Sequence, residues 1–170
     1  MTDPQKEFLH RHLVEGELYQ TIINQMGVTR QELSLWYEEL KPQRDIIASI
    51  RALWLRKQQT GNFPAFYAWY IAQKRICTYC GISEDEIKRL LEAKLLTTKR
   101  LATRGRRLEL DRRQPEAAYD DLENLTLACY WCNNAKTDTF TDKEFAEVGQ
   151  AFAKIWQQRL AQLLPAAEGN

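Results

Sequence analysis

The stretch that decides the fold is a pair of cysteine knuckles, Cys77-Thr-Tyr-Cys80 and Cys129-Tyr-Trp-Cys132, which contain all four cysteines of the 170-residue chain. Two C-x2-C pairs can supply the tetrahedral thiolate set of a structural zinc site. Two disulfides, or four unrelated thiols, are the alternatives. The chain begins Met1-Thr-Asp-Pro4 with no apolar signal segment, which favours a reducing cytoplasm and therefore zinc.

The sequence between and after the knuckles predicts a small ββα element. A short strand is expected near 107–110, ending just before Asp111, and a second near 125–128. A helix is expected to begin at the second knuckle. Because one zinc ion would draw the two knuckles together, Asp111 and Asn133 are expected to lie close to each other.

These residues resemble the HNH endonuclease family, in the branch whose ββα-metal element is clasped by four cysteines. The likeness covers residues 76–140. In the family, an Asp-His pair ends the first strand and an Asn precedes the second strand. A His or Asn directly follows the last cysteine, and a Lys comes after it. The resemblance implies a metal-dependent endonuclease with a structural zinc ion and a catalytic Mg²⁺ or Mn²⁺.

The resemblance also implies roles for individual residues. Asp111 and Asn133 stand where the family holds its divalent ion, and Asn124 stands where an Asn braces the loop behind the catalytic strand. Lys136 falls on the family's Lys. The departure is Arg112, which occupies the position of the general-base His.

Arg112 cannot accept a proton from water near neutral pH, because an arginine pKa lies above about 12. Its guanidinium can instead bind a phosphate through two parallel hydrogen bonds. Three sources of the activated water stay open. They are the metal ion alone, a carboxylate, or a histidine from elsewhere. The candidate residues are Glu109, Asp120 and Asp121 for the carboxylate, and His10 and His12 for the histidine.

Charge favours a phosphate partner locally and not across the whole chain. There are 24 Lys and Arg against 23 Asp and Glu, which is unlike a protein that coats DNA nonspecifically. Basic residues gather between Lys99 and Arg113, where a phosphodiester would approach Asp111. A solvated loop is the alternative. The nucleic-acid contacts predicted here are Arg104, Arg106, Arg107, Arg113 and Lys136.

A weaker resemblance near the N-terminus is to the helix-turn-helix pattern. Gly27 could form a left-handed turn between two helices, and Thr29 with Glu32 predicts a capping box that opens the second helix. That helix would present Arg30, Gln31 and Ser34 to a DNA groove. The alternatives are a helix-turn-helix shape without DNA contact, and packing for core or protein contact.

Elsewhere the chain predicts helical scaffolding. Apolar spacing predicts a helix from Pro42 to about Gln59, and the aromatic-rich segment from Phe63 to Arg75 is predicted to be core, with base stacking as the alternative. Capping boxes at Ser83 and Thr141 predict two more helices, the first running to about Leu96.

The expected fold is therefore mostly α with a small zinc-clasped ββα module (α+β). Its predicted parts are a helical, helix-turn-helix-like segment (1–41), a helical connector (42–75), the HNH-like module (76–140), and a C-terminal helix and tail (141–170).

The expected function is a bacterial or phage-type, cytoplasmic DNA endonuclease with no membrane partner. A homodimer and a larger protein complex both stay open. Two alternative functions remain. One is an inactive zinc module that binds nucleic acid as a regulator. The other is a subunit of a larger nucleic-acid-processing or defence assembly. No stretch of the sequence approaches the roughly 20 apolar residues of a membrane helix.

Overall fold

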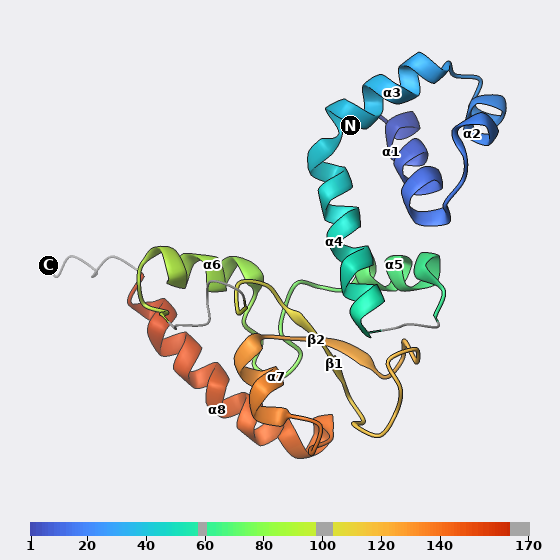
Figure 1. The fold of residues 1–170 in the computed structure, drawn as a ribbon. Coiled ribbons are helices and arrows are strands. Elements are labelled where there is room, and N and C mark those ends of the chain that lie inside the picture. Colours follow the sequence, from blue (N-terminus) through green and yellow to red (C-terminus); the bar gives the residue numbers. More distant parts are fainter. Residues whose placement is uncertain (58–60, 98–103, 164–170) are drawn as a thin grey trace, which may run out of the picture. The chain divides into compact units, whose positions relative to one another are not determined.

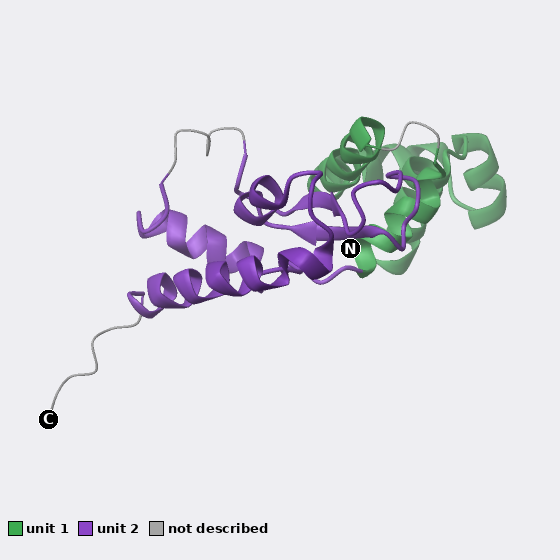
Figure 2. Ribbon diagram, turned by 90° about the horizontal axis from the view of Figure 1, so that it is seen from below, with its two compact units in different colours: residues 1–72 green, residues 73–170 purple. Residues whose placement is uncertain are grey.

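A computed structural model describes residues 1–57, 61–97 and 104–163. The chain divides into two compact units, residues 1–72 (unit 1) and 73–170 (unit 2), which Figure 2 shows in separate colours. The end of the predicted helix at Gln59, the basic residues Lys99 and Arg100, and the tail lie outside the described residues.

Unit 1 is built from helices. They are α1 (Asp3–Leu9), the π-helical segment η1 (His10–Glu15), α2 (Tyr19–Met26), α3 (Arg30–Glu39), α4 (Lys41–Lys57) and α5 (Phe63–Ala72). Segment η1 contacts α1, α2, α4 and α5, so it lies at the centre of the unit. The fully buried side chains include Phe8, Ile22 and Leu33, and the aromatic Phe63, Phe66 and Tyr70 of α5 are buried as predicted.

The turn between α2 and α3 follows the predicted pattern. Gly27 has φ +67°, a left-handed conformation that a residue with a Cβ adopts at a cost. Thr29 caps α3, and both hydrogen bonds of the Thr29–Glu32 capping box are present. Residues in the turn itself therefore determine where α3 begins.

Unit 2 contains the sheet and the cysteines. Its elements are α6 (Glu84–Glu92), β1 (Glu109–Arg112), β2 (Leu125–Ala128), α7 (Tyr130–Lys136) and α8 (Asp142–Ala161). Strands β1 and β2 pair antiparallel, with Asp111 opposite Thr126. Helix α7 packs on β1, and α8 contacts α6 and α7, as can be followed in Figure 1. The predicted capping boxes at Ser83 and Thr141 are both present.

Two sequence-based boundaries were wrong in unit 2. Strand β1 begins two residues later than predicted and includes Asp111 and Arg112, because its ladder partners run to Leu125. Helix α6 ends at Glu92 rather than near Leu96. Lys94 adopts a left-handed φ of 59° there, and the amides of Leu95 and Leu96 both turn back to the Leu90 carbonyl.

The predicted fold class is confirmed. The described residues are mostly helical, with one two-stranded sheet beside four clustered cysteines. Across the described residues, no helix combines the length and the apolar character needed to cross a bilayer.

Candidate functional site

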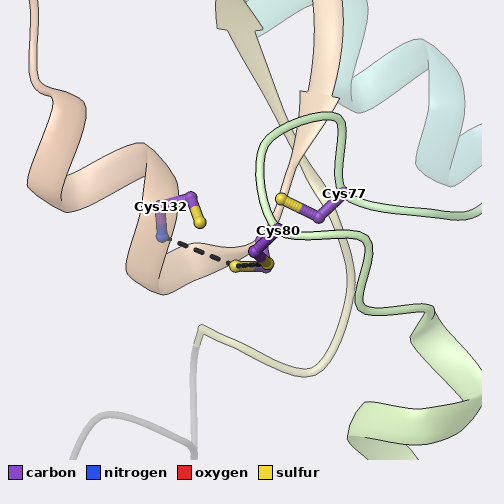
Figure 3. A group of neighbouring side chains, drawn as sticks. Cys77, Cys80 and Cys132 are labelled. Atoms are coloured by element: carbon purple, nitrogen blue, oxygen red, sulfur yellow. Dashed lines mark hydrogen bonds between the residues drawn. The ribbon is translucent and has the colours of Figure 1, made fainter. Parts of the chain in front are cut away.

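The four cysteines meet in the interior of unit 2. All four are buried, and their sulfur atoms lie within 4.8 Å of one another. Cys77 and Cys80 come from the loop before α6, while Cys129 caps α7 and accepts a hydrogen bond from the Cys132 amide at 3.5 Å. Figure 3 shows the side chains facing one another from these two segments. Four clustered thiols fit a structural metal ion such as zinc.

Asp111 lies beside this cluster, on the face of the sheet that α7 covers. Alternation along β1 places Glu109 and Asp111 on one face and Arg112 on the other. The Asp111 carboxylate is 5% exposed. Its Oδ2 accepts a hydrogen bond of 2.6 Å from the Tyr79 hydroxyl and lies 3.4 Å from the Lys136 ammonium. In the part of the chain that the structure describes, no hydrogen bond reaches Oδ1.

Tyr79 links the first knuckle to Asp111, since it lies between Cys77 and Cys80. Burial raises the pKa of Tyr79, and the hydrogen bond to Asp111 raises it further. The phenol therefore stays protonated and donates to the carboxylate. Its ring packs edge-on against Phe145 of α8, with 5.3 Å between the ring centroids. Closure of the cysteine cluster thus positions the donor that holds Asp111.

Lys136 is fully buried at the end of α7. Its ammonium donates a hydrogen bond of 2.7 Å to the Arg112 carbonyl, in addition to its ion pair with Asp111. A buried lysine held in this way supplies positive charge behind Asp111 and fixes the backbone of β1. It was predicted as a nucleic-acid contact, and the structure places its side chain in the interior of the site.

Asn133 and Glu109 form the second pair on this face. Asn133 Nδ2 donates to Glu109 Oε2 at 2.7 Å. The same carboxylate accepts two hydrogen bonds from Arg104, from Nε at 2.9 Å and from Nη2 at 2.6 Å. The Arg104 guanidinium also lies 4.9 Å from the centre of the Tyr130 ring. Glu109 is thus held by donors on two sides.

Arg112 and Asn124 both act on the loop between the strands. The Arg112 guanidinium donates to the Ala117 carbonyl at 3.1 Å and lies 4.7 Å from the centre of the Tyr119 ring. Asn124 accepts from the Gln114 amide at 2.7 Å and donates to the Gln114 carbonyl at 3.0 Å. This reciprocal pair closes the loop on itself, as expected for a bracing Asn.

A cavity of about 300 Å³ opens at the Asp111–Arg112 end of β1. It brings together Asp111, Arg112, Asn133, Lys136 and Arg104, which the sequence had singled out. The candidate bases Glu109, Asp120 and Asp121 are not among its lining residues, whereas the carboxylate of Asp138 is. The complete lining is Arg104, Asp111, Arg112, Pro115, Tyr119, Asn133, Asn134, Lys136, Thr137 and Asp138.

The other predicted contacts lie away from the cavity lining. Arg113 forms an ion pair with Asp142 at 3.3 Å, and Arg106 and Arg107 are exposed. Arg30 and Gln31 are exposed on α3 of unit 1, which also contains His10 and His12.

Sequence reasoning missed Tyr79 and Asp138 as site residues. The position of Tyr79 could have indicated a role, because a residue between two clustered cysteines has a fixed backbone position. Asp138 follows the end of α7, where the backbone turns at Thr137 with φ 56°. Nothing in the local sequence indicates that this turn brings its carboxylate to the cavity.

Comparison with known proteins gives one strong likeness. No family model matches the chain, and no curated protein matches it. Among solved structures, the rare-cutting HNH restriction endonuclease PacI matches with 31% sequence identity, over 65% of this chain and 75% of that one, with a TM-score of 0.47. With 31% identity over three quarters of that enzyme, the chain belongs to the HNH endonuclease family.

Proposed function

We propose that this chain is a metal-dependent DNA endonuclease that hydrolyses phosphodiester bonds in the cavity of unit 2. One observation carries the proposal. The carboxylate of Asp111 and the amide of Asn133 line the same cavity as the guanidinium-bearing Arg104 and Arg112. DNA is the proposed substrate because the matching solved structure is that of a restriction endonuclease described as perturbing DNA.

The donor set fits a Mg²⁺-class ion. Oδ2 of Asp111 is occupied by Tyr79 and Lys136, which leaves Oδ1 as a charged oxygen ligand. Asn133 Nδ2 donates a hydrogen bond to Glu109, which leaves Asn133 Oδ1 as a neutral oxygen ligand. Magnesium retains several waters and takes further ligands from phosphates, so two protein oxygens are a workable set. When bound, the ion would supply Lewis-acid stabilisation of the leaving 3′-oxygen.

The chain's own residues would bind and orient the phosphate. Arg104 borders the cavity with an exposed guanidinium, and Arg112 lines it between Tyr119 and the loop carbonyl of Ala117. Guanidinium groups match phosphate oxygens in pairs and stabilise the charge that builds up during hydrolysis. We assign Arg112 to this role and to support of the loop, and Lys136 to holding Asp111.

Asp138 is our candidate for accepting the proton of the attacking water. It contributes a second carboxylate to the cavity lining, in addition to that of Asp111, and it is exposed. Asp111 is occupied by its buried partners, and Glu109 is bound by Arg104 and Asn133. In Asp138→Asn, single-turnover cleavage is expected to slow by about 100-fold with DNA affinity unchanged. A wild-type rate in this variant would remove Asp138 from the mechanism.

The four cysteines are proposed to hold a structural zinc ion. Four buried thiols can fill all four positions of a tetrahedral zinc ion, which is the ligand set of a structural rather than a catalytic zinc. The ion would hold the loop that contains Tyr79 at a fixed position relative to the start of α7. Elemental analysis of the purified protein is expected to give one zinc per chain, and Cys132→Ser is expected to lose it.

The test of the function is cleavage of supercoiled plasmid and of single strands with Mg²⁺, Mn²⁺ or EDTA. Metal-dependent nicking that disappears in Asp111→Ala, at unchanged zinc content, is the expected result. No cleavage of either substrate with either metal would overturn the proposal.

A second candidate function is an inactive module that binds nucleic acid. Arg112 in place of the family's histidine favours it, because the guanidinium is turned to Ala117 and Tyr119. Salt-dependent DNA binding without cleavage is the outcome that would select it. A role as a subunit of a larger complex would instead give weak DNA binding by the isolated chain.

A further inference from the structure

We propose that Glu109 is a positioning residue, which fixes the side-chain amide of Asn133 so that its oxygen faces the catalytic ion. The inference rests on the proposed function, since it concerns the same metal site. It gives Glu109 a role different from that of general base, which the sequence had suggested.

The direction of one hydrogen bond determines how the Asn133 amide is turned. Glu109 Oε2 lies 2.7 Å from Asn133 Nδ2. An ionised carboxylate only accepts hydrogen bonds, so it must meet the NH₂ group of the amide and would repel the carbonyl oxygen. One carboxylate therefore selects one of the two amide orientations, in which Oδ1 of Asn133 points away from Glu109.

Asn133 borders the cavity, and Glu109 does not. Asn133 and Asp111 line it together with Arg104, whereas Glu109 is absent from its lining. Glu109 therefore contacts two lining residues, Asn133 and Arg104, without being one itself. Two oxygens of these lining residues are then left for a cation: Asn133 Oδ1, which is turned away from Glu109, and Asp111 Oδ1, which has no hydrogen-bond partner among the described residues. The amide then presents an acceptor, rather than a donor, to a cation.

Glu109 is itself held rigidly. Arg104 binds both of its oxygens, at 2.9 and 2.6 Å, and the residue belongs to β1. A side chain held by two parallel hydrogen bonds on a strand has little freedom to turn. Groups that orient a metal ligand from behind in this way typically affect metal affinity by about 10- to 100-fold.

The same contacts argue against Glu109 as the general base. Both of its oxygens already accept hydrogen bonds, from the Arg104 guanidinium and the Asn133 amide, so neither is directed at a water. Its absence from the cavity lining places it beyond direct reach of an attacking water.

The experiment is Mn²⁺ binding to the zinc-loaded 170-residue chain, followed by electron paramagnetic resonance. Glu109→Gln is expected to weaken binding by about tenfold, because a glutamine can either accept from or donate to Asn133 and no longer selects one amide orientation. Zinc content and thermal unfolding of the variant, compared with the wild type, report whether the module stays folded.

The decisive variant is the double change Glu109→Gln with Asn133→Asp. An aspartate at position 133 offers two equivalent oxygens, so one can accept a hydrogen bond from the glutamine amide at position 109 while the other faces the ion. The double variant carries the same net charge as the wild type. Its Mn²⁺ affinity is expected to return to the wild-type value or exceed it.

Arg107→Gln is the matched control, since it removes an exposed arginine near β1 and leaves the contacts of Glu109 with Arg104 and Asn133 in place. It is expected to bind Mn²⁺ at least as tightly as the wild type. Unchanged Mn²⁺ affinity in Glu109→Gln, or no recovery in the double variant, would overturn the positioning role and leave the proposed function standing. Absence of an Asp111-dependent Mn²⁺ site in the wild type would overturn both.

Discussion

Unit 1 buries apolar and aromatic side chains, whereas unit 2 also buries charged and polar ones. The described buried core of unit 1 includes Phe8, Ile22, Leu33 and Phe66. The polar and charged residues that are buried among the described residues all belong to unit 2, namely Asp111, Asn124, Thr126 and Lys136. Such groups are costly in a protein interior unless they are paired, so the interior of unit 2 depends on polar contacts in a way that the interior of unit 1 does not.

Metal removal should separate the two units most strongly. A structural zinc ion contributes about 10–16 kcal/mol in small zinc modules, and unit 2 surrounds four buried thiols. Chelation, or Cys132→Ser, is expected to abolish hydrogen-exchange protection in β1, β2 and α7. Peptides from residues 1–72 should stay protected, because their apolar core contains no metal ligand. Equal loss of protection in both units would contradict this division.

Lys136→Met should be the next largest effect. It leaves the buried Asp111 without its cation and the Arg112 carbonyl without its donor. Breaking one side of a buried ion pair costs about 3–5 kcal/mol. Denaturant unfolding should register this loss in unit 2, with Lys143→Met on the exposed surface of α8 as the control. A change below about 1 kcal/mol would mean that Asp111 is not held in this way.

Gly149→Ala tests the contact between α8 and the first knuckle. A Cβ at this position would lie 2.5 Å from the Tyr79 carbonyl oxygen, which belongs to the backbone and cannot turn aside. Overpacking of this kind costs about 1–3 kcal/mol. The neighbouring exposed Gln150→Ala serves as the control. Thermal unfolding that cannot distinguish the two variants would show that α8 shifts freely over Tyr79.

The capping boxes offer the smallest and most even comparison, since both units use the same device. Thr29 caps α3 in unit 1, and Thr141 caps α8 in unit 2. Replacing either threonine by alanine removes the hydroxyl that accepts a hydrogen bond from a first-turn amide and should cost about 1 kcal/mol. Chemical denaturation of the two variants should give similar losses. A several-fold difference would show that one cap also supports tertiary contacts.

Sequence reasoning succeeded where local chemistry determines the structure. The three boxes at Thr29, Ser83 and Thr141, the left-handed Gly27 and the gathering of the four cysteines follow from residues a few positions apart or from a fixed ligand count. Strand β2 was predicted at its observed bounds.

The failures have a common physical cause, which is that packing decides side-chain direction and chain ends. Lys94 ends α6 in a conformation for which its sequence gives no signal. The burial of Lys136 depends on α7 closing over β1, and the role of Glu109 depends on which way one amide faces. The spacing of residues in the sequence indicates neither the direction of the Lys136 side chain nor that of the Asn133 amide.

The central claim is that phosphodiester chemistry takes place at Asp111 in unit 2. Its most direct measurement is the single-turnover rate of plasmid nicking in Mg²⁺, with wild type and Asp111→Ala compared at equal zinc content and equal DNA occupancy. We predict cleavage by the wild type and a loss of at least about 1000-fold in the variant. Equal rates, or no cleavage by either protein, would contradict the claim.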